Sequence, residues 1–408
     1  MIALKQLGSF KNGLNFGAEA VTERGYDIIG IPDFGDNYIA PNHNLKKVNS
    51  EIVLSDYLLA EDDILFVRSN GNKALVGRTM IVKDIENPTT FSGFCIRYRP
   101  DSKKVFPLYM LYLFKSPIFR RFFANNQQTS ITNLNQDVLG SILIDLPSLE
   151  KQKAIANTIH CITRQIENNN CINDNLAQQA KLLYDYWFTQ FDFPDENNKP
   201  YRSSGGKMEW NDRIKRNIPT GWHVVTFTNI ATWESNSQPP KSEFRYEPQD
   251  GYVRFIQNRD YDSNAHKTYI PLTKNLSIVD RLDILMDKYG DAGAVRYGIE
   301  GAFNVALGKI NVHNTSHREY IRSYLESDGI YTYLHNSCMA STRASLSESN
   351  LANLILVMPD DVTIAKYEAI LNNIRKRILK NNDEIEKLVE LRDWFLPLLM
   401  NGQATIAE

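Results

Sequence analysis

The chain of 408 residues has only four cysteines, Cys95, Cys161, Cys171 and Cys338, and no two of them form a CxxC pair. Such sparse and widely separated thiols argue against a disulfide framework or a zinc site and are typical of a reducing compartment. The sequence also lacks any run of 18 apolar residues and the charged-then-apolar pattern of a secretory signal at its N-terminus. We therefore expect a cytoplasmic protein.

The motifs of common catalytic sites are missing as well. The chain has no GxxxxGK[ST] phosphate loop, no GxGxxG, no HExxH and no GxSxG. We also find no Asn/Asp-Pro-Pro-aromatic stretch of the kind that amino-methyltransferases use, and no nuclease carboxylate set. His313 and His317 have helical i, i+4 spacing, but their polar surroundings favour a solvated face over a metal site. These absences predict a protein that recognises another molecule or acts as a scaffold, and that holds no metal.

The chain also has no excess of positive charge. It carries 46 Lys and Arg against 48 Asp and Glu, a formal net charge of −2, and the balance is nearly even along the sequence. A free-standing DNA-binding protein usually has a basic excess. If this chain binds DNA, its phosphate contacts must be clustered locally or supplied by a partner.

What the sequence does have is a long heptad-patterned segment that occurs twice, once after Pro147 and once after Pro359. Apolar residues alternate in steps of four and three, as in the seam of a coiled coil. The seam positions, related by an offset of 212 residues, are Ile155, Ile159, Ile162, Ile166, Asn169 and Leu176 in the first copy and Tyr367, Leu371, Ile374, Ile378, Asn381 and Leu388 in the second. The second seam then slips phase to Leu391 and Phe395. Ser148 and Asp360 follow the prolines and should cap the helices.

A helix of roughly 40 residues is about 60 Å long, several times the usual globular helix. We expect the two helices to pair antiparallel with each other; the alternative is two ordinary amphipathic helices, each packed on its own domain. The matching polar positions Asn169 and Asn381 are expected to fix the register at a cost in stability, unless they merely tolerate burial.

The two helices divide the chain into segments 1–147, 148–191, 192–359 and 360–408. Repeated strings link the first and third segments: Asp63-Ile64-Leu65 corresponds to Asp283-Ile284-Leu285, and Asn133-Leu134 to Ser345-Leu346. The chain therefore reads as an α+β protein with an internal pseudo-repeat. Residues 192–218, with Pro, Asn, Gly and Ser, are expected to form a linker.

Hydrophobic patterns and turn signals predict the elements within each half. In the first half we expect strands at 63–68, 74–82, 91–99 and 142–144, a helix at 106–124 and a polar loop at 125–132. In the second half we expect strands at 252–257, 283–288, 294–297 and 354–357, a helix at 318–336 and a polar loop at 341–343.

The alternation of globular domain, helix, globular domain and helix resembles the specificity (S) subunit of type I restriction-modification enzymes over essentially the whole chain. Residues 68–78, 130–155, 301–310 and 391–403 contain strings similar to that family. The resemblance implies two α/β target-recognition domains, in segments 1–147 and 192–359, held apart by a pair of long antiparallel coiled-coil helices. It implies a non-catalytic protein that reads a bipartite, asymmetric DNA target, one half-site per domain.

The resemblance also implies partners. Two methyltransferase subunits would dock on the helices and domains, and two restriction (motor-nuclease) subunits would join them. S-adenosylmethionine, ATP and Mg²⁺ would bind those partners, and no cofactor would bind this chain.

Base reading needs donors and acceptors on well-positioned loops, because Arg matches guanine and Asn or Gln matches adenine in the major groove. We expect them in the hairpin turn of each domain and in the loop before its last strand. The candidates are Arg68, Asn70, Asn72, Lys73, Arg78, Gln127, Gln128 and Thr129 in the first domain and Gln257, Asn258, Arg259, Lys288, Tyr289, Arg296, Thr342 and Arg343 in the second. The alternative for each is a solvated turn residue.

Two other functions remain open from the sequence. The chain could be a single-chain modification enzyme with an unrecognised catalytic set, or a scaffold without DNA reading. Binding of S-adenosylmethionine by the purified chain would indicate the enzyme. Salt-dependent, sequence-specific binding by an assembled complex would exclude the scaffold.

Overall fold

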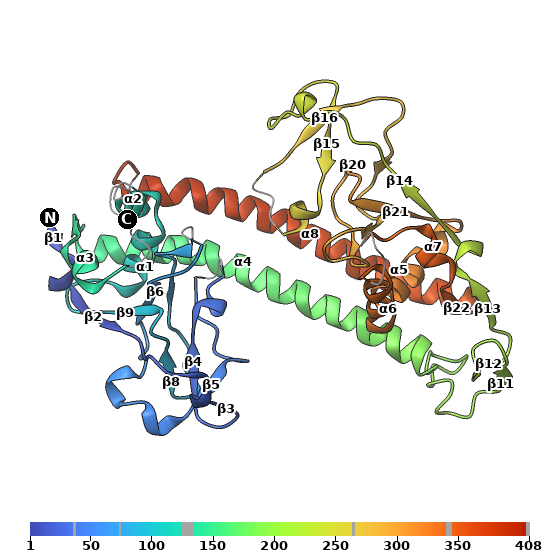
Figure 1. Cartoon of the computed structure of the whole chain (residues 1–408), viewed down its shortest axis with the longest axis horizontal. Helices are drawn as coiled ribbons and strands as arrows, with labels where there is room; N and C mark the ends of the chain where they lie inside the picture. Colours follow the sequence, from blue (N-terminus) through green and yellow to red (C-terminus); the bar gives the residue numbers. More distant parts are fainter. Residues whose placement is uncertain (36–37, 73–74, 125–133, 263–265, 340–344, 405–408) are drawn as a thin grey trace. The chain divides into compact units, whose positions relative to one another are not determined.

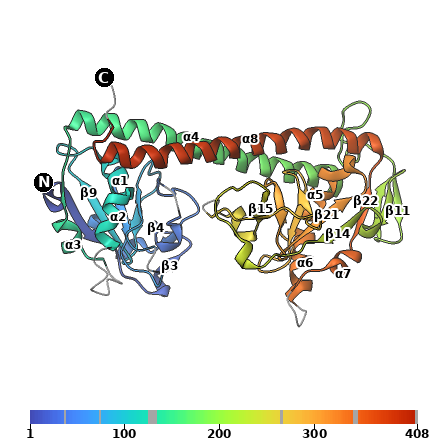
Figure 2. The ribbon, with the colours of Figure 1, turned by 90° about the horizontal axis from the view of Figure 1, so that it is seen from above.

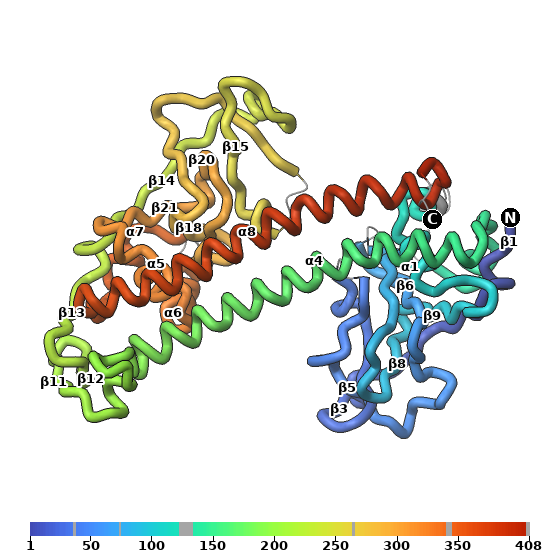
Figure 3. Tube along the Cα trace, turned by 180° about the vertical axis from the view of Figure 1, so that it is seen from behind, coloured from blue at the N-terminus to red at the C-terminus, as the bar shows by residue number. Residues whose placement is uncertain are grey.

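A computed structural model describes residues 1–35, 38–72, 75–124, 134–262, 266–339 and 345–404. The chain divides into two compact units, one made of residues 1–169 and 384–408 and the other of residues 170–383. We call them unit 1 and unit 2. The division passes through both long helices, α4 (Leu149–Tyr184) and α8 (Asp361–Met400), so each unit contains a part of each helix (Figures 1 and 3). No helix in the described part of the chain combines the length and apolar character needed to cross a membrane.

Unit 1 is built on two four-stranded sheets. The first contains, in order, β2 (Gly8–Asn12), β9 (Cys95–Pro100), β6 (Ile64–Val67) and β7 (Thr79–Ile81), all antiparallel. The second contains β3 (Val21–Thr22), β5 (Lys46–Val48), β4 (Tyr26–Ile29) and β8 (Thr89–Phe91), in which β4 and β8 run parallel. A separate pair joins β1 (Ile2–Ala3) to β10 (Leu143–Ile144).

The central strand β6 lies between two cores. Because successive side chains of a strand point to opposite sides, its apolar residues are divided between these cores. Ile64 and Phe66 lie in the core that contains helix α1 (Pro107–Lys115), whereas Leu65 and Val67 lie in the core that contains Phe91 of the second sheet. The continuous apolar run of β6 is thus explained by its place between two cores.

The predicted helix at 106–124 is in fact two helices, α1 and α2 (Pro117–Ala124). Ser116 separates them with extended angles, φ −66° and ψ 149°. A residue before proline is disfavoured in the helical region, so Pro117 ends α1. The short helix α3 (Gln136–Ser141) follows, capped by the side chain of Asn135.

Unit 2 has the same kinds of sheet. One contains, in order, β14 (Ala231–Ser235), β21 (Leu307–Val312), β18 (Ile284–Asp287) and β19 (Val295–Arg296), all antiparallel. Another contains β16 (Tyr269–Pro271), β15 (Tyr252–Ile256), β20 (Gly301–Phe303) and β17 (Ile278–Val279), in which β15 and β20 run parallel. A separate pair joins β13 (His223–Thr226) to β22 (Ile355–Met358).

The helices of unit 2 pack beside these strands (Figure 2). They are α5 (Arg318–Glu326), α6 (Asp328–Met339) and α7 (Glu348–Ala352). The predicted helix at 318–336 is therefore also divided, at Ser327, whose ψ of 141° is extended. The central strand β18 again faces two cores, with Ile284 and Met286 on one side and Leu285 on the other.

The expectation that residues 192–218 form a linker is wrong. The segment contains β11 (Met208–Asn211), which pairs with β12 (Arg216–Pro219) in a hairpin. Phe193 is buried, with its ring stacked 4.6 Å from Tyr201 and 4.7 Å from Trp222 between centroids. The turn-forming residues do lie in turns. The aromatic residues between the turns, however, attach the segment to the core of unit 2.

The predicted helix caps are confirmed. The Ser148 hydroxyl accepts the N–H of Lys151 at 3.4 Å, and the Asp360 carboxylate accepts the N–H of Thr363 at 2.8 Å. The first helix ends in a π-helical turn at residues 185–189, and the second runs through Pro397 to Met400.

Both helices contribute side chains to the core of each unit. In unit 1, Ala156 of α4 shares a core with Leu396 of α8. In unit 2, Tyr184 of α4 shares a core with Tyr367 of α8. None of the predicted seam positions from Ile155 to Leu388 is exposed. Leu391, where the predicted seam slips phase, is 40% exposed, because α8 instead turns Leu396 and Leu399 into the core.

Two polar contacts join the helices in unit 2. The Asn381 side-chain amide donates to Asn173 Oδ1 at 2.9 Å, and the Asn173 amide donates to Asn382 Oδ1 at 2.8 Å. Asn381 is buried, so this pairing satisfies a polar group that would otherwise be costly there.

Candidate nucleic-acid interface

In unit 1 the candidate residues gather at the end of strand β6. Arg68 follows the strand directly: its N–H donates to the carbonyl of Phe94 at 2.8 Å, and its own carbonyl accepts the N–H of Leu134 at 2.9 Å. The Arg68 guanidinium Nη1 donates to the carbonyl of Gly93 at 3.4 Å. Arg68 is thus held where the turn after β8 meets the segment that leads into α3.

Two further candidates of unit 1 are held by local contacts. Asn70 Oδ1 accepts the N–H of Asn72 at 2.9 Å, which closes a turn beside the strand end. The Arg78 guanidinium donates to the carbonyl of Gly35 at 3.2 Å. Asn72 is exposed, while Arg68, Asn70 and Arg78 are partly buried.

In unit 2 the corresponding place is the end of strand β18. Lys288 follows the strand, its N–H donates to the carbonyl of Ala306 at 2.8 Å, and its carbonyl accepts the N–H of Leu346 at 3.0 Å. The Lys288 ammonium donates to the hydroxyl of Ser235 at 2.9 Å and lies 5.5 Å from the centroid of the Trp233 ring. Burial lowers the pKa of Lys288.

The strands that lead to these two places also begin alike. Asp63 Oδ2 accepts the N–H of Ala60 at 2.8 Å before β6, and Asp283 Oδ2 accepts the N–H of Asp280 at 3.1 Å before β18. Arg68 and Lys288 therefore occupy equivalent positions: each is one residue past a central strand, with its N–H and its carbonyl bonded to equivalent segments.

Arg296 is largely engaged inside unit 2. Its guanidinium lies 2.8 Å from the carboxylate of Asp287 and 3.3 Å from that of Asp291, and its side chain is 25% exposed. Burial raises the pKa of Asp287, and the ion pair with Arg296 opposes that shift. A guanidinium with two carboxylate partners has fewer donors left for a base. Arg296 is therefore better placed to hold the β18–β19 hairpin than to read DNA.

The other described candidates of unit 2 lie after β15 and beside Lys288. Gln257 donates to the hydroxyl of Thr268 at 3.1 Å, and Arg259 donates to the same hydroxyl at 3.4 Å. Asn258 begins a short 3₁₀ turn, and the Arg259 side chain is 55% exposed. Tyr289 is 49% exposed. Lys73, Gln127, Gln128, Thr129, Thr342 and Arg343 lie outside the described residues.

The turn between β8 and β9 is not predicted by the sequence. Its pattern predicts one strand over residues 91–99, whereas β8 ends at Phe91 and β9 begins at Cys95. The intervening Phe94 is 60% exposed. Ser92-Gly93 was a turn signal in the sequence, but the β-forming residues on both sides outweighed it.

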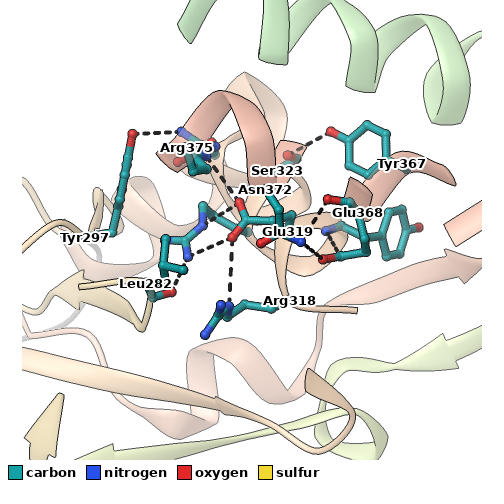
Figure 4. Close-up of polar contacts among 12 residues, drawn as sticks. Leu282, Tyr297, Arg318, Glu319, Ser323, Tyr367, Glu368, Asn372 and Arg375 are labelled. Carbon is teal, nitrogen blue, oxygen red and sulfur yellow. Dashed lines mark hydrogen bonds and ion pairs between the residues drawn. The ribbon is translucent and has the colours of Figure 1, made fainter. Parts of the chain in front are cut away.

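A buried ion cluster joins α5 to α8 within unit 2 (Figure 4). The Glu319 carboxylate accepts from Arg322 Nε at 3.0 Å and from Arg375 Nε at 3.2 Å, and all three side chains are almost fully buried. Arg375 also pairs with Glu326 at 2.5 Å and donates to the Tyr297 hydroxyl at 3.1 Å. Beside them, burial raises the pKa of Glu368 to about 7. All of these groups have partners within the fold, which indicates a structural role.

No group of three or more His, Cys, Asp or Glu side chains in the described ranges is arranged to hold a metal ion. At the end of β6 the fold holds Arg68 and Asn70, and at the end of β18 it holds Lys288 next to the ion pair of Asp287 with Arg296. Donors at such strand ends can hydrogen-bond the polar groups of a nucleic acid.

A profile of the type I restriction modification DNA specificity domain matches residues 1–178 and 219–389. The chain therefore belongs to the family of type I restriction-modification DNA specificity proteins, which confirms the resemblance seen in the sequence.

Several relatives of the chain are named specificity subunits. The chain is 24% identical over 357 residues to the type I restriction enzyme MjaIX specificity subunit of Methanocaldococcus jannaschii, an alignment that covers 83% of this chain and 77% of that subunit. It is 21% identical to the HindI specificity subunit of Haemophilus influenzae, with coverage of 80% and 84%.

The crystal structure of the S subunit of a type I restriction-modification system from M. genitalium has a similar fold. The TM-score is 0.61 at 15% sequence identity, and the alignment covers 97% of this chain and 94% of that one.

Proposed function

We propose that this chain reads DNA sequence for a type I restriction-modification complex without catalysing a reaction itself. Each unit would read one half of a bipartite, asymmetric target through the loops at the ends of its central strand. The observation that carries this proposal is the equivalent placement of Arg68 and Lys288, each fixed through both its N–H and its carbonyl. A protein that reads a bipartite target needs hydrogen-bond donors held in equivalent positions in its two recognition domains.

An internal pseudo-repeat, with domains at 1–147 and 192–359, accounts for this placement. It is supported by the sheet orders β2-β9-β6-β7 and β14-β21-β18-β19, in which sequentially corresponding strands occupy the same positions. Antiparallel pairing of α4 and α8 is part of the proposal. Contacts within unit 2 support it, because the Trp187 ring just after α4 lies 5.7 Å from that of Tyr367, whereas the earlier residue Asn173 bonds the later residue Asn381.

The partners follow from the family. Two methyltransferase subunits and two restriction subunits would assemble with this chain on double-stranded DNA in the cytoplasm. S-adenosylmethionine, ATP and Mg²⁺ would be held by those subunits. The balanced charge of the chain supports a division of labour in which partners supply part of the phosphate contacts.

The test is methylation mapping of DNA by the complex of this chain with its methyltransferase subunit. Arg68→Ala and Arg259→Ala are expected to relax different half-sites, each by about 1–3 kcal/mol if the guanidinium contacts a base. Arg213→Ala, an exposed arginine in the β11–β12 hairpin, serves as the control and should leave both half-sites intact.

If a variant instead lowers methylation equally on all DNA sequences, the replaced arginine, Arg68 or Arg259, contacts phosphates. Methylation by the chain alone, or its binding of S-adenosylmethionine, would favour the single-chain enzyme. Sequence-independent methylation by the complex would favour the scaffold.

A further inference from the structure

The turn from Ser92 to Cys95 carries an unusual side chain for its surroundings. Phe91 and Cys95 on either side are fully buried, but Phe94 is 60% exposed. Leaving a phenylalanine in water forgoes most of the free energy that its burial would contribute. Single exposed apolar side chains are common on protein surfaces, so the position of Phe94 in the fold, and not its exposure alone, points to a partner.

The turn that carries Phe94 is firmly held. The Cys95 N–H donates to the carbonyl of Ser92 at 2.9 Å, and the Gly93 N–H donates to the carbonyl of Leu14 at 2.7 Å. A side chain at Gly93 would meet the exposed Asn15 side chain, which can move aside, so the two backbone hydrogen bonds are what hold this turn. Phe94 is thus presented from a rigid frame, which limits the entropy lost when it makes a contact.

Phe94 is also a neighbour of the proposed reading residue Arg68. The Phe94 carbonyl accepts the Arg68 N–H, and the carbonyl of the preceding Gly93 accepts from the Arg68 guanidinium. Unit 2 repeats this frame with Lys288 bonded to Ala306, and the Leu307 N–H closes the turn on Asn304 at 3.1 Å. In this frame Ala306 takes the place of Phe94 and is only partly exposed, whereas the exposed apolar residue is the preceding one, Val305, at 41%.

We propose that Phe94 makes an apolar contact to the C5-methyl group of a thymine in the half-site read by unit 1. Phenylalanine and other apolar side chains make this contact in the major groove, where the thymine methyl group distinguishes it from the other bases. The inference rests on the proposed function and adds a specificity-determining residue to it. The alternative is that Phe94 contacts an apolar surface of a partner protein, and the experiment distinguishes this alternative from the thymine contact.

The experiment uses the complex of the full chain with its methyltransferase subunit and duplexes whose target has been mapped. Each thymine of the half-site is replaced in turn by uracil, which lacks the methyl group. For the unaltered chain, one replacement should lower the methylation rate about fourfold, the effect of one buried methyl group. Phe94→Ala should lower the rate on thymine and abolish the thymine–uracil difference at that position alone.

Phe94→Leu keeps an apolar side chain and should keep part of the difference. Leu54→Ala, which changes another exposed apolar residue of unit 1 that is 68% exposed, is the matched control and should behave like the unaltered chain. Because Phe94 contributes little to the core, the thermal midpoint of Phe94→Ala is expected to remain within about 2 °C of the original.

Three results would overturn the inference: a half-site without thymine, a thymine–uracil difference that survives in Phe94→Ala, or a loss of rate on all sequences caused by weaker subunit assembly. The last result would assign Phe94 to a protein contact. Failure of the proposed function is recognised separately, because Arg68→Ala and Arg259→Ala would then leave both half-sites unchanged.

Discussion

Replacing Arg375 by methionine tests whether the buried ion cluster holds unit 2 together. The substitution retains an apolar stem but removes the guanidinium from Glu319, Glu326 and the Tyr297 hydroxyl (Figure 4). Breaking a buried ion pair by removing one partner typically costs about 3–5 kcal/mol, since the remaining charge is left desolvated.

The structure places Arg375→Met at the lower end of that range. Glu319 keeps Arg322 at 3.0 Å, so it is not left without a counter-charge. The side chain of Glu326 is 31% exposed and can be partly hydrated. We therefore expect the free energy of unfolding to fall by about 3 kcal/mol.

Urea denaturation followed by tryptophan fluorescence measures this loss. Trp187, Trp210, Trp222 and Trp233 lie in unit 2, and the Trp187 ring is 5.7 Å from that of Tyr367 on α8. Arg377→Met changes an exposed arginine two residues further along the same helix and should stay within about 0.5 kcal/mol. A loss below about 1 kcal/mol for Arg375→Met would refute the reasoning, because the cluster would then contribute no more than a surface pair.

Two further predictions concern the same helices. Glu368 has its pKa raised to about 7 by burial, so its contribution to stability is complete below about pH 4.5 and is lost as the pH rises through 7. On going from pH 5 to pH 8, the free energy of unfolding of Glu368→Gln should therefore rise by roughly 2–3 kcal/mol relative to that of the unaltered chain. The same pH dependence for both proteins in urea titrations would contradict this. Inserting seven residues after Glu167 and after Leu379 preserves the heptad phase and adds about 10 Å, or about three base pairs, to the helix pair. If the helices set the half-site spacing, methylation mapping should show the same half-sites with a longer spacer, whereas an unchanged spacer would show that they do not.

The local signals of the sequence were sufficient for the long helices and their starts. Heptad spacing and the residues after Pro147 and Pro359 depend on contacts within a few residues, and the Ser148 and Asp360 caps were found where expected. The same signals failed at Leu391, because which face of α8 is buried near its end is decided by the globular body of unit 1 and not by the heptad pattern.

Composition also misread segments that mix turn formers with aromatic residues. The composition of residues 192–218 predicts a linker, whereas Phe193 stacks on Trp222, which lies far along the chain from it. Such packing depends on the whole core of unit 2, so no window of the sequence contains it.

The family could be recognised from the sequence because its strings and its alternation of domains and helices are sequential features. The frame of the proposed reading sites could not. Arg68 is bonded to Leu134 and Lys288 to Leu346 through backbone groups that every residue has, so nothing in the side-chain pattern identifies the pairs. The exposure of Phe94 was likewise decided only by the tertiary structure, because a turn between two short buried strands points one apolar side chain outward while its neighbours enter the core.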